Sequence, residues 1–278
     1  MSGTLYAISD LHVAYPENRK VVEELRTDSP DDWLIVAGDV SERFGEIEWV
    51  LATLRERFAK VIWAPGNHEL WTPKDDPVQL RGDDRYRALV ELCRGLDVLT
   101  PEDPYAVWSG GPGGPVTVAP LFLLYDYTFR PEGTADKTEA LAAAYAAGVV
   151  CTDEMMLHPD PYPSREAWCE ARIEETERLL ARRDPALPTV LVNHYPLVRE
   201  PTRILRYPEF ALWCGTERTA DWHRRYDAAA MIYGHLHIPR ITWADGVRFE
   251  EVSLGYPREW GPRGGPHRPR RVLRAEER

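Results

Sequence analysis

Five short blocks of the sequence place Asp, Asn or His directly after an apolar run. In chain order they are Ser9-Asp10-Leu11-His12, Gly38-Asp39, Gly66-Asn67-His68-Glu69, Asn193-His194 and Gly234-His235-Leu236-His237. A single His after a strand is most often a hydrogen-bonded structural residue. Five blocks together predict that these side chains converge, because a site on an α/β sheet forms where successive strands end.

The residue types in these blocks predict a metal site. Carboxylate, imidazole and amide groups suit Mn, Fe, Zn or Co, and the blocks contain no cysteine for a softer ion. The pairs Asp10/His12 and His235/His237 are two residues apart, so in extended chain both members point the same way. Three blocks also contain a glycine, which permits a tight turn beside an ion: Gly38, Gly66 and Gly234.

The elements between the blocks must position them. Short apolar runs at 5–8, 33–37 and 60–64 alternate with helical patterns, which predicts a buried and largely parallel sheet. Further strands are expected at 116–124, 189–192 and 228–233, and a hairpin at 241–252 around Ala244-Asp245-Gly246. Helices are expected at 21–26, 44–58, 83–93 and 136–147, and from the N-cap Ser164 to Arg183.

Taken together, the blocks resemble the signature of the calcineurin-like metallophosphoesterases: DxH, GD, GNH(E), a later His, then GHxH. They occur in the family's order between residues 10 and 237, and none is missing. The resemblance implies an α/β fold, a four-layer α-β-β-α sandwich with the site at the strand ends. It also implies a phosphoester hydrolase with two divalent metal ions.

The same resemblance implies a role for each residue. The first metal would bind Asp10, His12 and His237. The second would bind Asn67, His194 and His235, and Asp39 would bridge both. Two ions about 3.5–4 Å apart can grip a phosphoryl group and activate a water. His68 would then stabilise the transition state or protonate the leaving oxygen.

A narrower resemblance concerns the substrate. Segments at 29–39, 65–71, 121–127, 207–216 and 255–260 look like the actinobacterial phosphopantetheinyl hydrolase branch of the family. That branch implies removal of 4′-phosphopantetheine from holo-acyl carrier protein. Two alternatives stay open: a general small-molecule phosphatase or nucleotide phosphodiesterase, and a non-catalytic metal-bound scaffold.

We expect a single domain over 1–278, with a cap-like insertion within about 70–192 that determines specificity and a basic C-terminal tail at 261–278. The tail is expected to be solvated and partly disordered. Its arginines, with Arg199, Arg203 and Arg206, could alternatively receive an acidic carrier protein.

Composition excludes several classes of function. The net charge of −11 argues against general binding to nucleic acid or to anionic membranes. No stretch approaches the roughly 18 apolar residues of a transmembrane helix, and the N-terminus lacks a signal-peptide pattern. The four cysteines show no CxxC pair. A cytoplasmic protein with free thiols is therefore expected.

The remaining polar candidates have competing interpretations. Glu69 could support a metal ligand or form a structural ion pair. Asp126 is more plausibly a hydrogen-bonded loop acid than a cleft residue, and His158 and His223 are expected on the surface or in loops. Arg258 would suit a phosphate, although stacking on Trp260 explains it nearly as well.

Overall fold

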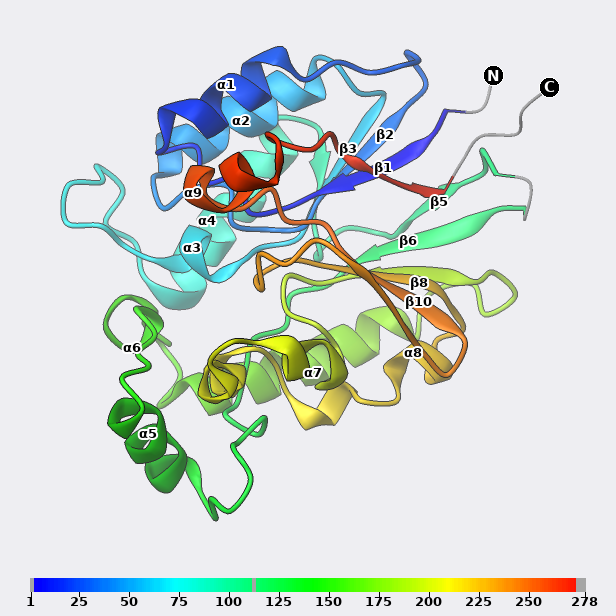
Figure 1. Ribbon diagram of the computed structural model, residues 1–278. Coiled ribbons are helices and arrows are strands. Elements are labelled where there is room, and N and C mark those ends of the chain that lie inside the picture. The colour runs from blue at the N-terminus through cyan, green and yellow to red at the C-terminus, as the bar shows by residue number, and fades with distance from the viewer. Residues whose placement is uncertain (1–2, 112–113, 274–278) are drawn as a thin grey trace.

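The computed structural model describes residues 3–111 and 114–273 as four layers, with two β-sheets packed face to face between layers of helices (Figure 1). The first sheet has the strand order β11 (Arg270–Leu273), β1 (Leu5–Ile8), β2 (Trp33–Val36), β3 (Lys60–Trp63) and β4 (Val98–Leu99). The second has the order β5 (Ala106–Trp108), β6 (Val116–Pro120), β7 (Thr189–Val192), β8 (Ala228–Tyr233), β10 (Val247–Glu251) and β9 (Ile241–Ala244). The expected α-β-β-α sandwich is confirmed.

The α-helices vary from single turns to four turns. They are α1 (Pro16–Glu24), α2 (Phe44–Arg55), α3 (Asn67–Leu70), α4 (Gly82–Gly95), α5 (Lys137–Ala146), α6 (Asp153–Met156), α7 (Arg165–Leu180), α8 (Trp222–Arg225) and α9 (Pro257–Trp260). Short 3₁₀ helices are η1 (Glu200–Ile204), η2 (Pro208–Trp213), η3 (Glu217–Thr219) and η4 (Gly261–Arg263).

Apolar side chains fill the space between the two sheets. Side chains alternate along each strand, so Leu5 and Ala7 of β1 face the second sheet while Tyr6 and Ile8 face the helices. The layer between the sheets contains mainly Val, Ile, Leu and Ala, all buried. The central strands β1–β4 are parallel, as are β6, β7, β8 and β10. The parallel arrangement expected from the apolar runs is confirmed.

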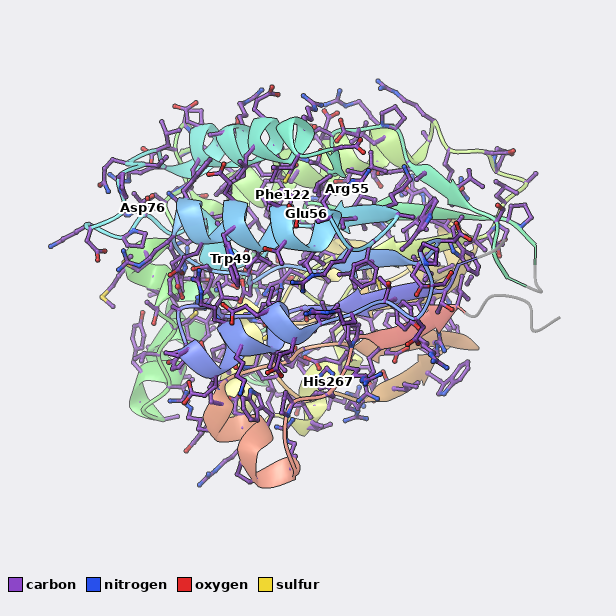
Figure 2. The ribbon with its side chains drawn as sticks, turned by 90° about the horizontal axis from the view of Figure 1, so that it is seen from above. Trp49, Arg55, Glu56, Asp76, Phe122 and His267 are labelled. Atoms are coloured by element: carbon purple, nitrogen blue, oxygen red, sulfur yellow. The ribbon has the colours of Figure 1, made fainter. Side chains whose placement is uncertain are left out.

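Helices cover the outer face of each sheet. Seen from above, α1, α2 and α4 lie across the first sheet (Figure 2). Trp49 stands on the flank of α2 that faces α1, and the Arg19 guanidinium lies 3.9 Å from its ring centroid. Helices α7 and α8 cover the second sheet (Figure 1). Ser164 caps α7 by accepting a hydrogen bond from the amide of Ala167, as expected.

Several expected boundaries differ from the structure. The first helix begins at Pro16, because proline is favoured in the first helical turn. The strand expected at 116–124 ends at Pro120. Within 70–192, β4, β5 and β6 belong to the two sheets. The part that stands away from them in Figure 1 contains α5 and α6, residues 137–156, hereafter the insertion.

The C-terminal segment corrects another expectation. Strand β11 pairs antiparallel with β1, and its Val272 is buried. Arg271 on the opposite face lies 3.0 Å from Asp28. The expectation of a solvated tail is therefore wrong for residues 270–273, because alternating polar and apolar residues complete the sheet edge. Residues 274–278 of the expected tail lie outside the described residues.

The two sheets are joined at the edge where the carboxyl ends of their parallel strands meet. Ser9, directly after β1, forms a parallel bridge with Ser253, two residues after the end of β10. The amide of Gly255 also donates to the carbonyl of Asp10 over 3.1 Å. Loops from both sheets therefore meet at one edge, where the candidate ligands lie.

Candidate metal centre

A first group of candidate ligands comes from the loops after β1 and β8. Asp10, His12 and His237 each offer an atom, and these atoms lie within 4.8 Å of one another. Nε2 of His237 lies 2.9 Å from Asp10 Oδ1 and 3.2 Å from His12 Nε2. One carboxylate and two imidazoles thus face a common centre.

A second group comes from the loops after β2, β7 and β8. Asp39, His194 and His235 also offer atoms within 4.8 Å of one another. Nε2 of His194 lies 3.3 Å from Asp39 Oδ2. Asn67, at the first residue of α3, is buried and lines the same cavity as Asp39 and His235. The structure therefore brings all seven expected ligands together, and their binding of metal stays a prediction.

The backbone at these residues is unusual. Among the described residues nine non-glycine positions have positive φ, and five of them are Asp10, His12, Asp39, His235 and His237. Such conformations cost free energy and concentrate at functional sites. A Cβ on Gly66 would lie 2.1 Å from Asp39 Oδ1, and one on Gly234 would lie 2.2 Å from Asp10 Oδ2. The expected need for glycine beside the ligands is met at both positions.

Unpartnered buried atoms test whether these residues suit metal ions. Asn67 Oδ1, His194 Nε2 and His235 Nε2 are buried and form no hydrogen bond within residues 3–111 and 114–273. Leaving a buried polar atom unpaired costs about 1–3 kcal/mol, so native proteins rarely do it three times in one place. A divalent cation would satisfy all three atoms, and the donor set therefore fits.

The charge states also fit metal ligands. Burial, with repulsion from His194, lowers the pKa of His235 to about 3, so its imidazole is neutral. Burial alone would raise the pKa of Asp39, but attraction to His194 and His68 holds it well below its usual value. Burial alone would lower the pKa of His194, yet Asp39 raises it to about 10. Metal ligands bind deprotonated, so a bound cation would displace that proton.

His68 lies beside these groups and is held by a residue that sequence reasoning missed. Its Nδ1 lies 2.5 Å from Oε1 of Glu42, and its Nε2 lies 3.8 Å from Asp39 Oδ2. Burial would lower the pKa of His68, but Asp39 and Glu42 raise it above its usual value. Glu42 follows Asp39 by three residues in the same loop, and that proximity was the available signal.

Glu69 holds two ligand loops in place. Its carboxylate accepts hydrogen bonds from the amides of Asp39, Val40 and Gly66 at 2.9–3.0 Å. Burial and then Asp39 raise its pKa to about 7. Glu69 thus supports ligand residues by binding their backbone amides. The alternative expectation, a structural ion pair, is wrong.

A second missed residue supports His237. Oε2 of Glu259 lies 2.8 Å from His237 Nδ1 and accepts the amide of Tyr256 over 2.9 Å. Because one ring nitrogen faces Glu259, the other faces Asp10. Such partners orient a ligand histidine and fix its tautomer. Glu259 stands at the third position of α9, where acidic residues often cap a helix, and that pattern was its only sequence signal.

The remaining candidates have clear positions. Asp126 accepts bonds from Thr128 and Thr216, so the expectation of a hydrogen-bonded loop acid is confirmed. His223 is buried in α8 with Nε2 2.9 Å from Asp245, so its expected surface position is wrong. His158 is half-buried after α6. The Arg258 guanidinium lies over the ring of Tyr256, 4.9 Å from its centroid, and not over Trp260 as the stacking interpretation expected.

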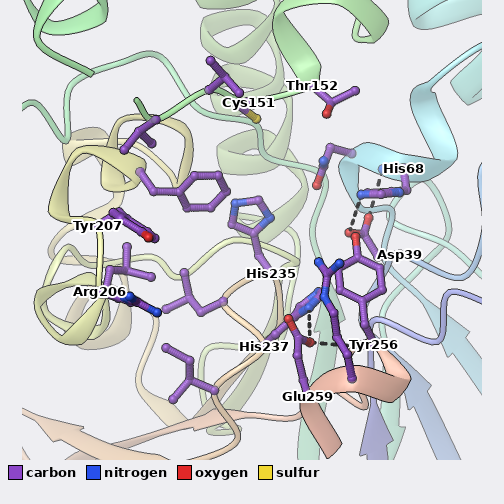
Figure 3. A pocket seen from close by; sticks show the side chains of 18 of the residues that line it. Asp39, His68, Cys151, Thr152, Arg206, Tyr207, His235, His237, Tyr256 and Glu259 are labelled. Atoms are coloured by element: carbon purple, nitrogen blue, oxygen red, sulfur yellow. Dashed lines mark hydrogen bonds and ion pairs between the residues drawn. The ribbon is translucent and has the colours of Figure 1, made fainter. Parts of the chain in front are cut away.

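Four of the seven candidate ligands line a cavity of about 750 Å³, namely Asp39, Asn67, His235 and His237 (Figure 3). Asp39, His68 and Tyr256 lie on one side, and Arg206 and Tyr207 lie across from them. The rest of the lining includes a large apolar part. It is formed by residues 147–151, Leu205, Phe210, Leu236 and Ile238. The cavity thus has a polar part and an apolar part, and it is large enough for a small organic group.

Comparisons with known proteins agree with this geometry. A family model described as calcineurin-like phosphoesterase matches residues 3–239. The chain is 60% identical over 257 residues to the [acyl-carrier-protein] phosphodiesterase PptH of Mycobacterium tuberculosis, covering 92% of this chain and 79% of that protein. The crystal structure of phosphopantetheinyl hydrolase PptH from the same organism superposes with a TM-score of 0.93 at 57% identity, over 99% of this chain and 96% of that one. Separately, none of the helices in the described part of the chain has the length and apolar character to cross a membrane.

Proposed function

The chain belongs to the calcineurin-like phosphoesterase family and is a hydrolase of phosphoric ester bonds, and on that premise we propose that it cleaves 4′-phosphopantetheine from holo-acyl carrier protein. The observation that carries the proposal is the similarity to PptH along 92% of the chain, joined to a cavity with one ligand-rich and one apolar wall. The alternative of a non-catalytic scaffold is not favoured, because the similar protein PptH is a phosphodiesterase.

We propose that two divalent cations from the group Mn, Fe, Zn and Co bind at the two clusters. Asp10, His12 and His237 would hold the first. Asn67, His194 and His235 would hold the second, with Asp39 shared between both. When bound, the ions would supply charge stabilisation for the phosphoryl group and activation of a water.

The chain's own groups account for the proton. Hydrolysis forms a bond from the water oxygen to phosphorus and breaks the bond from phosphorus to the carrier serine oxygen, which must then gain a proton. His68 lies in the cavity wall, and Glu42 fixes its Nδ1 side so that Nε2 is the atom on the side of Asp39. We therefore assign His68 Nε2 as the donor to the serine oxygen. The products are the apo carrier and free 4′-phosphopantetheine.

The apolar wall gives the remainder of the substrate a place. A pantetheine chain is long, narrow and mostly uncharged apart from its phosphate, with a dimethyl group near the phosphate end. Val149, Leu205 and Phe210 belong to the apolar part of the cavity lining, and Phe210 stacks on the ring of His235. A chain of this kind can lie along that wall while its phosphate reaches the two clusters.

The partner and the location follow from this substrate. Carrier proteins are acidic, so a chain with a net charge of −11 needs a local basic surface to receive one. Arg206 lines the cavity, and Arg203 lies three residues before it, on η1. We propose that these arginines contact the carrier.

We also propose that the reaction takes place in the cytoplasm. All four cysteines are free and buried, and thiols stay reduced in that compartment.

The experiment is incubation of the purified protein with a holo-acyl carrier protein and Mn²⁺, followed by intact-mass spectrometry of the carrier. The carrier should lose the mass of one phosphopantetheine group, and the His68→Asn variant should convert it far more slowly. p-Nitrophenyl phosphate and its bis ester are tested in parallel. Brisk hydrolysis of these esters, with several carriers left intact, would favour a general phosphatase or nucleotide phosphodiesterase instead.

A further inference from the structure

A carboxylate from the insertion contacts the candidate metal centre. Asp153 is the first residue of α6, and its side chain is fully buried. Its Oδ1 accepts hydrogen bonds from Asn67 Nδ2 over 2.9 Å and from Trp71 Nε1 over 2.7 Å. One oxygen therefore holds two residues that lie 86 and 82 positions away in the sequence. No motif of the sequence pointed to this contact.

The contact determines which way the Asn67 amide faces. The indole N–H of Trp71 can only donate, so Asp153 Oδ1 is an acceptor and the group of Asn67 that faces it must be the NH₂. The amide oxygen then lies on the other side, where it is buried and has no hydrogen-bond partner in the described part of the chain. Divalent cations bind an amide through oxygen and not through its nitrogen. A flipped amide would present the wrong atom to the second cluster.

The contact also holds the ring that packs on His68. Trp71 stacks on the His68 imidazole with ring centroids 3.8 Å apart and an angle of 30° between the planes. The N–H group of the indole, which is its only hydrogen-bond donor, donates to Asp153, and this bond fixes the rotation of the ring. Glu42 approaches His68 through Nδ1. His68 is thus positioned by its own hydrogen bond and by a ring that Asp153 holds.

The rest of α6 is anchored without the Asp153 carboxylate. Arg165 donates to the backbone carbonyl of Asp153 over 2.6 Å. The neighbouring Glu154 accepts from Tyr127 and Trp213, both at 2.8 Å, and lies 3.1 Å from Arg165. Removing the Asp153 carboxylate should therefore leave the insertion in place. Glu154 also offers a matched control, because it supports α6 but does not contact Asn67.

We propose that Asp153 is a positioning residue, which fixes the Asn67 amide with its oxygen toward the second metal position and holds Trp71 against His68. The inference rests on the metal sites of the proposed function. The insertion would then also support the metal centre, because Asn67 keeps its orientation only while α6 is packed against it. Loss of an outer partner of this kind typically lowers metal affinity about 10–100-fold.

The test compares Asp153→Leu, Asp153→Asn and Glu154→Gln with the unmodified protein. Each is stripped of metal and titrated with Mn²⁺ by calorimetry, and metal content is measured by mass spectrometry. Asp153→Leu should weaken the second binding event about 10–100-fold and leave the first unchanged. Asp153→Asn keeps an acceptor oxygen for both donors and should restore most of the affinity. Glu154→Gln should bind both ions as the unmodified protein does.

The outcomes separate this inference from the proposal beneath it. If the unmodified protein binds fewer than two Mn²⁺ ions, the two-metal site itself fails. If it binds two and Asp153→Leu binds them equally well, Asp153 has no positioning role. Equal weakening by Glu154→Gln would assign the effect to the packing of the insertion and would also overturn the inference. Should Asp153→Leu not fold, Asp153→Ala removes the acceptor without added volume and carries the same expectation.

Discussion

Oε1 of Glu42 lies 2.5 Å from Nδ1 of His68, and the second nitrogen of that ring lies 3.8 Å from Asp39. The carboxylate and the imidazole form a pair at the edge of the ligand clusters, beside the ions' expected positions. His12, Glu42 and His68 also lie close enough to form a third metal-sized group. Two roles for His68, proton donor and metal ligand, can therefore be separated by experiment.

For His68→Asn we expect kcat to fall by about 10²–10⁴-fold with little change in KM, because the interaction is made mainly in the transition state. Both metal ions should remain, since no expected ligand is altered. Steady-state kinetics and metal analysis of the same preparation test this. Glu42→Gln should lower kcat less, because the ring itself remains. Loss of metal from His68→Asn would instead make His68 a ligand.

Asp39→Asn tests the shared carboxylate. The amide keeps the shape of the side chain and an oxygen that can accept the His68 amide, which donates to Asp39 Oδ1 over 3.0 Å. The fold should therefore survive, as measured by circular dichroism. The charge that attracts both cations is lost, so most metal and nearly all activity should disappear. A variant with full activity and normal metal content would rule out the binuclear arrangement.

Glu259→Ala should affect the first cluster and spare the second. Glu259 orients His237 through Nδ1, so its loss frees the ring and should weaken the first metal about 10–100-fold. Mn²⁺ titration of the metal-free protein measures this. Glu217→Ala, an exposed acid in the first turn of η3, serves as the control and should bind both ions normally. The prediction is contradicted if the second binding event is the one that weakens.

The sequence made the ligands predictable because each follows an apolar strand within a short block. Parallel strands of one sheet bring their carboxyl ends to one edge, so local pattern was enough to place Asp10 and Asp39 together, whereas His235 follows a strand of the second sheet. The paired sheets followed from family resemblance rather than from periodicity. Strand β11 was missed because its arginines suggested a solvated tail, although Val272 alternates with them.

The supporting residues were harder to predict, and chain separation explains why. Glu42 lies three residues from Asp39 and could have been found from the block alone. Asp153 reaches Asn67 across 86 residues, and nothing local marks it, because burial and direction come from how α6 docks. Such contacts depend on tertiary packing, which a single sequence does not encode as a pattern.

The carrier-protein surface can be tested by charge. Arg203 is an exposed residue of η1 that pairs with Glu200 over 2.9 Å, and Arg206 lines the cavity with its guanidinium 5.4 Å from the ring centroid of Tyr207. An exposed ion pair is worth little, so Arg203 can exchange Glu200 for a partner's carboxylate. Arg178 forms a similar i,i+3 pair with Glu175 on α7 and does not line the cavity, which makes it a matched control.

If these arginines receive an acidic carrier, raising the ionic strength should slow carrier hydrolysis much more than hydrolysis of a small aryl phosphate. Salt screens exposed charges beyond roughly 8–10 Å, whereas coordination inside the cavity is screened far less. Arg203→Glu and Arg206→Glu should mimic high salt, by lowering kcat/KM for the carrier far more than for the aryl ester. Arg178→Glu should leave the ratio of the two activities unchanged. If carrier turnover is insensitive to salt and to both substitutions, the hydrolysis itself stands, and the carrier must dock on another surface.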